Sequence, residues 1–217
     1  KALDLVPNLS PYIEEAVKVP DCSIDPFRLC MLNIISSQKR NGIIFIRHKV
    51  TQIIKEHGRC VGVKAADQVS GELREIHGKV IINATGAWSH LVAQLAGNEV
   101  PLTLSKGSLV ITNHRLTNMV INRMRPSADG DIIVPNEAVC LAGTTSLAVE
   151  DPDKISIESQ EVDTIINEAG RMIPHFNDTR IIRAFSGVRP LLKSPNTDSR
   201  EITRGFQIIN HGDNMYS

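Results

Sequence analysis

The feature that most limits how this chain can fold is a strand that runs into a small-residue turn and then a helix. Residues 79–97 are KVIINATGAWSHLVAQLAG. The apolar run 80–82 is typical of a buried strand, and a helical pattern begins at Trp88 and ends before Gly97. Proteins of the α/β class often place a nucleotide phosphate at such a junction. The stretch therefore predicts an α/β unit whose turn at residues 83–86 approaches a nucleotide.

The glycine-rich sequence that normally completes a dinucleotide site does not occur in these 217 residues. No two glycines lie two positions apart, so there is no G-x-G, and there is no G-x-x-x-x-G-K-[ST] either. The first residue is Lys1 rather than Met. We therefore interpret the chain as an internal piece of a longer protein, with the rest of the nucleotide site before Lys1.

Charge and composition exclude several kinds of protein. Lys and Arg number 24, as do Asp and Glu, so the formal net charge is zero and no nucleic-acid surface is expected. No apolar run approaches the roughly 20 residues of a membrane span, and the start lacks a signal-peptide pattern. The four cysteines form no C-x-x-C pair and no Cys/His cluster occurs, so we expect reduced thiols, no metal site and a cytoplasmic protein.

The patterns before Pro101 predict one helix, a short strand and a three-stranded meander. The helix is expected to begin at Asp25–Pro26, with the aspartate as N-cap, and to end at Asn41–Gly42. The meander is expected to turn first at His57–Gly58. The predicted strands are 43–46, which is apolar and expected to be buried, and 49–56, 59–66 and 72–77.

After Pro101 the patterns predict a mainly antiparallel sheet with one long helix. The helix is expected over 157–173, because its apolar residues form one stripe and Pro174 stops it. The predicted strands are 104–113, 119–123, 131–135, 139–145, 180–192 and 205–210. Together the two parts predict an α+β fold with domains at 1–97 and 98–217.

Several motifs in a fixed order indicate a family. They are IDPFRL (24–29), NATGAW (83–88), LSKGSLV (104–110), INRMRPSADGDIIVP (121–135), LAGTTS (141–146) and RAFSGVRPLL (183–192). Together they resemble the FAD-dependent glycerol-3-phosphate dehydrogenases of the D-amino-acid-oxidase-like superfamily, above all the large, catalytic subunit of the anaerobic bacterial enzymes. The resemblance implies that 1–97 is the second half of an FAD-binding domain, and that 98–217 is a C-terminally incomplete substrate domain.

The resemblance also implies which residues approach FAD in the intact protein. These are Val50, whose backbone would meet the adenine, and the turn residues Ala84, Thr85 and Gly86, which would approach the diphosphate and ribose. From the residues alone, Val50 is equally a strand valine and the turn an ordinary helix entry. Because G-x-G is missing, the chain by itself is expected to carry no FAD and to be inactive.

Two arginines are the expected substrate residues by the same resemblance. Arg189 in SGVRP would face the flavin and act on substrate, and Arg204 in ITR would bind the substrate phosphate. A surface salt bridge is the alternative for Arg189. Lys106 and Ser108 are either flavin or substrate contacts or part of a solvated turn. Thr144 and Thr145 either lie beside the cofactor or form structural hydrogen bonds.

The resemblance implies oxidation of sn-glycerol 3-phosphate to dihydroxyacetone phosphate by hydride transfer to FAD. Electrons would pass to a quinone pool, with further subunits linking the enzyme to the inner face of the cell membrane. Two alternatives stay open: another FAD-dependent oxidoreductase of the superfamily, acting on an amine or amino acid, and a non-catalytic binding module. The pair Arg189 and Arg204 favours a phosphate, because one arginine suffices for a carboxylate.

Overall fold

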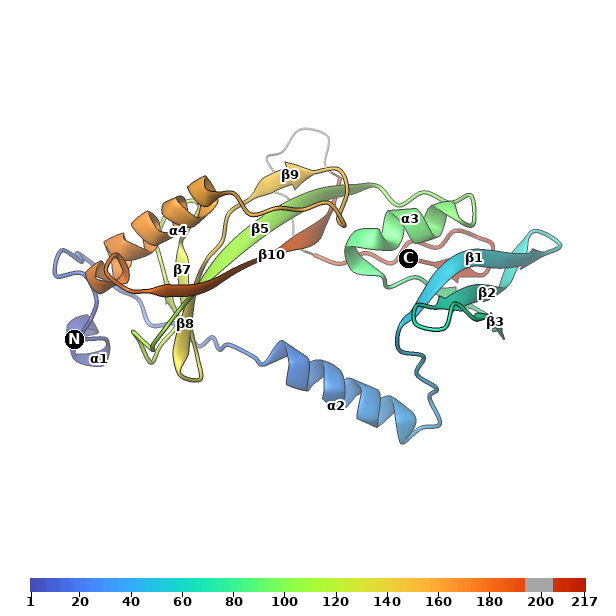
Figure 1. Ribbon diagram of the computed structural model, residues 1–217, viewed down its shortest axis with the longest axis horizontal. Coiled ribbons are helices and arrows are strands. Elements are labelled where there is room, and N and C mark those ends of the chain that lie inside the picture. Colours follow the sequence, from blue (N-terminus) through green and yellow to red (C-terminus); the bar gives the residue numbers. More distant parts are fainter. Residues whose placement is uncertain (194–204) are drawn as a thin grey trace. The chain divides into compact units, whose positions relative to one another are not determined.

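The computed structural model describes residues 1–193 and 205–217 and divides into two compact units (Figure 1). Unit 1 comprises Lys1–Ser23 and Thr103–Thr203, and unit 2 comprises Ile24–Leu102 and Arg204–Ser217. Each unit is thus built from two separate segments, whereas the sequence predicted a single boundary between 97 and 98. The difference arises because the first residues and the last residues each pack on a distant part of the chain.

Unit 1 contains, among the described residues, a six-stranded sheet of order β10-β5-β8-β7-β6, with β9 pairing β5. The register is antiparallel for β5–β8, β5–β9, β6–β7 and β7–β8, which confirms the antiparallel sheet predicted after Pro101. The short β9 was not expected. The strands are β5 (Leu102–Thr112), β6 (Ile121–Asn122), β7 (Ile132–Asn136), β8 (Val139–Gly143), β9 (Leu147–Val149) and β10 (Ile181–Leu192).

Pro174 ends the long helix of unit 1, as predicted, and begins a 3-10 turn, η2 (Pro174–Phe176). The helix, α4 (Ser159–Met172), covers the core of the unit. Its apolar stripe packs on the sheet: Ile165 of the helix, Val110 of β5 and Ile133 of β7 belong to one cluster and are fully buried. Cys140 lies in the same core, as expected for an unreactive thiol. The helix is therefore stabilised mainly by burial of one face.

The N-terminal segment joins unit 1 through hydrogen bonds as well as packing. It contains a short helix, α1 (Ala2–Leu5), which was not predicted. The Asn8 side chain donates to the main-chain oxygen of Leu116 at 2.8 Å, and the Ser10 amide donates to that of Met172 at 2.8 Å. These bonds attach the first residues to residues more than a hundred positions away.

Unit 2 contains the predicted meander, β1 (His48–Glu56), β2 (Arg59–Asp67) and β3 (Leu73–His77), with antiparallel pairing throughout. The first turn lies at His57–Gly58, as predicted, and both residues have positive φ. A second, two-stranded sheet pairs β4 (Ile81–Ile82) in parallel with β11 (Met215–Tyr216). No strand was predicted at β11.

The end of the chain is tied to the meander by one carboxylate. Asp213 accepts hydrogen bonds from Lys55 Nζ at 2.9 Å, from Asn98 Nδ2 at 3.2 Å and from Cys60 Sγ at 3.3 Å. Burial would raise the pKa of Asp213, but these donors lower it to about 2, whereas burial raises the pKa of Cys60 to about 11. This cluster holds Asp213, just before β11, against β1 and β2.

Two strand predictions were wrong. Residues 43–46 are exposed, with Ile43 at 78%, and no described strand pairs with them, because strand formation requires a partner edge. Residues 205–210 are likewise not a strand. Ile209 instead exchanges two main-chain hydrogen bonds with Ser217, and Asn210 forms one isolated bridge with Tyr216.

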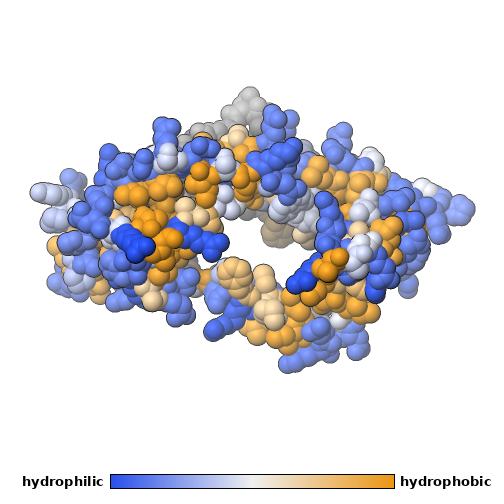
Figure 2. Space-filling model, viewed as in Figure 1, coloured by the Kyte–Doolittle hydropathy of each residue, from blue (hydrophilic) through white to orange (hydrophobic). Residues whose placement is uncertain are grey.

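The helix before residues 43–46, α2 (Pro26–Gln38), begins as predicted, with Asp25 accepting from the Arg28 amide at 3.0 Å. It buries none of its residues in the described structure. Apolar side chains such as Phe27 and Leu32 therefore lie on the surface, and Figure 2 shows apolar residues gathered over this part of the chain. The local capping signal sets where the helix begins, but it does not provide a surface for the helix to pack on.

Candidate functional site

The predicted cofactor turn follows β4 directly and is exposed. Ala84, Thr85 and Gly86 all lie on the surface of unit 2. The buried Asn83 holds the turn from below: its Nδ2 donates to the Ser89 main-chain oxygen at 2.8 Å, and its Oδ1 accepts from Thr85 Oγ1 at 2.7 Å. A rigid base and an exposed backbone are what close approach of a ligand to a strand end requires.

Gly86 has no side chain, so its backbone is open to a ligand at this turn. Its φ is +59°, and a Cβ atom built there would meet nothing within 4 Å, so the space beside its backbone is open. It begins a 3-10 turn, η1 (Gly86–Trp88), which continues into α3 (Ser89–Gln94). This geometry fits a ribose or diphosphate lying against the backbone. Trp88, at the end of this 3-10 turn, is 43% exposed.

Val50 lies in β1 opposite Ala65, immediately before an irregularity in the register at Gln52. Its side chain is partly buried and packs against the core of unit 2 around Ile53 and Cys60. The side chain thus has the structural role that was the alternative interpretation. Contact of its backbone with adenine stays a prediction.

Arg189 lies on β10, beside β5, and its guanidinium is held from two directions. Its Nη2 donates to Thr144 Oγ1 at 2.6 Å, and its Nη1 donates to the Thr145 main-chain oxygen at 3.3 Å. On the β5 side it lies against Gly107, where a Cβ atom would come within 2.3 Å of Nη2 and 2.6 Å of Cζ. These contacts orient the guanidinium, and the role of Arg189 at a substrate stays a prediction.

Gly107 is a residue beside the predicted site that sequence reasoning missed. The motif LSKGSLV drew attention to Lys106 and Ser108, on either side of it. The signal available was a glycine inside a strand, which often marks a close approach of another group. The identity of that group, Arg189, lies far along the chain and could not be read from the motif.

Lys106 and Ser108 are buried, and both bind the carboxylate of Glu161. Lys106 Nζ donates to Oε2 at 2.7 Å, and Ser108 Oγ donates to Oε1 at 2.8 Å. Thr145 Oγ1 also donates to Oε1 at 2.8 Å, and the Glu158 amide donates to Oε2 at 3.0 Å. Thr145 thus has the structural hydrogen bonds that were one of its two alternatives.

This carboxylate is buried and stays ionised. The side chains of Lys106 and Glu161 are 6% and 7% exposed. Burial alone would raise the pKa of Glu161, but the bonds from Lys106, the Glu158 amide, Ser108 and Thr145 lower it to about 2. Each oxygen of Glu161 receives two donors, so the carboxylate is fully hydrogen-bonded, as a buried charge requires.

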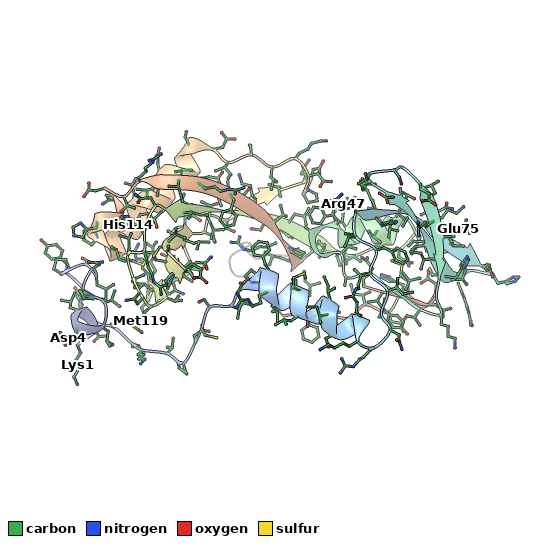
Figure 3. All side chains as sticks on the ribbon, turned by 60° about the horizontal axis from the view of Figure 1, so that its bottom comes forward. Lys1, Asp4, Arg47, Glu75, His114 and Met119 are labelled. Carbon is green, nitrogen blue, oxygen red and sulfur yellow. The ribbon has the colours of Figure 1, made fainter. Side chains whose placement is uncertain are left out.

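The motif INRMRPSADGDIIVP forms a second charged cluster in unit 1. Arg125 binds Asp131 and Glu168, with Nη2 at 2.9 Å from the Glu168 carboxylate, and Arg123 also binds Glu168. These ion pairs connect the segment between β6 and β7 to α4. A pocket of about 760 Å³ lies beside them, lined among others by Lys1 and Met119, which Figure 3 labels. Arg189 does not line this pocket, so we assign the pocket no part in the predicted site.

Three further findings concern what the described residues contain. Arg204, the second predicted substrate arginine, lies outside them. Within residues 1–193 and 205–217, no group of three or more His, Cys, Asp or Glu residues could hold a metal ion. In the same part of the chain, no helix has the length and apolarity needed to cross a membrane.

Comparison with known proteins gives the chain its relatives. The family described as FAD dependent oxidoreductase matches residues 1–215. One subunit of the anaerobic glycerol-3-phosphate dehydrogenase of Haloferax volcanii is 40% identical over 98% of this chain, and one subunit of the anaerobic Escherichia coli enzyme is 37% identical over 95%. The chain spans only 38% and 39% of the lengths of these two relatives.

A solved structure supports the fold. The glycerol-3-phosphate dehydrogenase of Bacillus halodurans, complexed with FAD, superposes with a TM-score of 0.71 at 22% identity, covering 87% of this chain and 38% of that one. The family match over almost every residue, together with an exposed small-residue turn after β4, leads to one conclusion. The chain belongs to the family of FAD-dependent oxidoreductases.

Proposed function

We propose that this chain is part of the catalytic subunit of an FAD-dependent glycerol-3-phosphate dehydrogenase. The observation that carries the proposal is 40% identity, over 98% of the chain, with the Haloferax volcanii relative of that name. The enzyme would oxidise sn-glycerol 3-phosphate at C2 and release dihydroxyacetone phosphate. When bound, FAD supplies the acceptor for the hydride that leaves C2.

In this proposal Arg189 binds the substrate. Its guanidinium stays charged at any working pH and has a planar set of donors suited to phosphate or alkoxide oxygens. The bonds to Thr144 and Thr145 fix its orientation before substrate arrives, which reduces the entropy lost on binding. Once substrate is bound, the guanidinium would stabilise negative charge on the C2 oxygen as the hydroxyl proton leaves. Arg204 would add a second cation for the phosphate dianion.

The turn after β4 would hold the cofactor. Ala84, Thr85 and Gly86 expose main chain at a strand end, and the open space beside Gly86 supports this role. Val50 would contribute its backbone to the adenine. We assign no general base among the described residues.

The decisive experiment is reduction of the bound flavin in the full-length protein. Bleaching of the flavin absorbance by sn-glycerol 3-phosphate, but not by glycine, proline or D-alanine, is the expected result. Bleaching by an amino acid alone would favour the amine or amino-acid oxidoreductase. A full-length protein without bound flavin would favour a non-catalytic binding module and would contradict the proposal.

We further infer partner proteins, since the Haloferax volcanii and Escherichia coli relatives are each named as one subunit of an enzyme. Such partners would receive the electrons, pass them to a quinone pool and hold the enzyme at the inner face of the cell membrane. Co-purification of a tagged full-length protein from solubilised membranes tests this. A tagged protein that oxidises glycerol 3-phosphate with a quinone as a single polypeptide would contradict it.

A further inference from the structure

The buried Glu161 is linked to Arg189 through a single residue, Thr145. The hydroxyl of Thr145 donates to Glu161 Oε1 at 2.8 Å and accepts from the Ser108 amide at 2.9 Å. The main-chain oxygen of the same residue accepts from Arg189 Nη1. Thr145 therefore has its side chain fixed by the buried carboxylate, while its main chain fixes the guanidinium.

Strand β5 lies between the two charged groups. Because side chains alternate along a strand, Lys106 and Ser108 project to one face and Gly107 to the other. Lys106 and Ser108 bind Glu161 on the first face, and Gly107 adjoins the Arg189 guanidinium on the second. The three consecutive residues thus connect a fully paired carboxylate to the position of the arginine.

We propose that Glu161 and Thr145 are positioning residues for Arg189. The carboxylate, held by four donors, fixes the Thr145 side chain, and the 144–145 segment then holds the guanidinium against Gly107. The proposal rests on the proposed function, because it assigns these residues an effect on substrate oxidation. Neither residue touches the substrate: both act through Arg189.

Simple structural support is the competing explanation, because a buried ion pair and a buried hydroxyl both contribute to stability. The two explanations differ in what else changes. Structural support predicts lower stability with unchanged kinetics for each folded, flavin-loaded molecule. Positioning predicts that the mobility of Arg189 and the kinetics change together.

The first test measures the chemical accessibility of the Arg189 guanidinium and does not require enzyme activity. In the full-length protein, the rate at which phenylglyoxal modifies Arg189 is followed by mass spectrometry of the Arg189 peptide. Thr145→Val should raise this rate about three- to tenfold, the factor that corresponds to one lost hydrogen bond, and Thr145→Ser should restore it. Thr112→Val is the matched control. Thr112 lies on β5 and is buried like Thr145, but its hydroxyl binds the main chain of Cys140 and His114 rather than Glu161.

The second test is a double-mutant cycle. The measured quantity is kcat/KM for the oxidation of sn-glycerol 3-phosphate, calculated per bound flavin. Thr145→Val should lower kcat/KM about three- to tenfold in the wild type. It should have almost no further effect in the Arg189→Lys background, because the group that it positions is gone. Thr112→Val should lower the melting temperature but leave kcat/KM unchanged.

Each outcome is decisive. Effects that multiply in the double variant, or an unchanged modification rate in Thr145→Val, would overturn the positioning role. If Thr145→Val does not fold, Glu161→Gln takes its place, since it keeps the side-chain volume and loses the charge that binds Lys106. If the wild type does not oxidise glycerol 3-phosphate, the proposed function fails, while the modification rate still tests the positioning.

Discussion

Arg189 is the residue on which the proposed chemistry depends most. Arg189→Lys keeps the charge but loses the planar set of donors, so the contact becomes one movable point. Losing a charge-assisted contact costs about 1.5–3 kcal/mol, which lowers kcat/KM roughly ten- to a hundredfold. Steady-state kinetics with flavin content measured alongside test this. Arg183→Lys, an exposed change on the same strand, should have no effect, and wild-type kinetics in Arg189→Lys would refute the assignment.

Gly107 sets the space that the guanidinium occupies. In Gly107→Ala the new methyl group would lie within 2.3–2.6 Å of three atoms of the Arg189 guanidinium. Either the strand backbone or the guanidinium must therefore move. The mobile partner is the end of a long side chain, so we expect Arg189 to shift and the fold to persist. The expected result is a loss of kcat/KM of about tenfold, as for one charge-assisted hydrogen bond, with a melting temperature near that of the wild type. Unchanged kinetics would show that Arg189 is not confined by Gly107.

At the scale of elements, the pair of Glu161 on α4 with Lys106 on β5 joins the helix to the sheet. Because burial and hydrogen bonding leave the pKa of Glu161 at about 2 rather than 4.5, its ionisation stabilises the folded state above pH 4.5. That stabilisation is lost as the pH falls from 4.5 towards 2. Glu161→Gln should therefore cost about 3 kcal/mol at neutral pH, as for a broken buried pair, and distinctly less at about pH 3.

Urea unfolding of the wild type and the variant at both pH values measures this difference. Asp163→Asn, which changes an exposed carboxylate on the same helix, is the control and should leave stability nearly unchanged at either pH. A difference between wild type and Glu161→Gln that stays constant from neutral pH to about pH 3 would contradict an ionised Glu161.

At the scale of the whole molecule, these 217 residues lack the glycine-rich turn of a dinucleotide site. They contain no G-x-G, and without that turn the FAD diphosphate lacks its close backbone approach. We expect the purified 217-residue chain to keep no flavin through gel filtration and to show no dehydrogenase activity. The absorbance spectrum of the eluted protein is the measurement, and a yellow protein with stoichiometric flavin would contradict the prediction.

Sequence alone determined the elements whose causes are local, and it determined the family. Asp25–Pro26 starts a helix through an N-cap and a compatible proline, and His57–Gly58 forms a hairpin turn through its own backbone preferences. The stripe of α4 predicts both a helix and its buried face. The ordered motifs resemble one dehydrogenase family, and the comparisons agree. Each of these signals lies within a short stretch of chain.

Only the tertiary structure decided which distant segments meet. The pairing of β4 with β11, the approach of Arg189 to Gly107 and the pairing of Lys106 with Glu161 all join residues far apart in sequence. Periodicity and capping carry no information about such partners, since they depend on neighbours along the chain. For the same reason the apolar run 43–46 was predicted as a buried strand but is exposed. Burial depends on a partner surface, and a local pattern does not specify one.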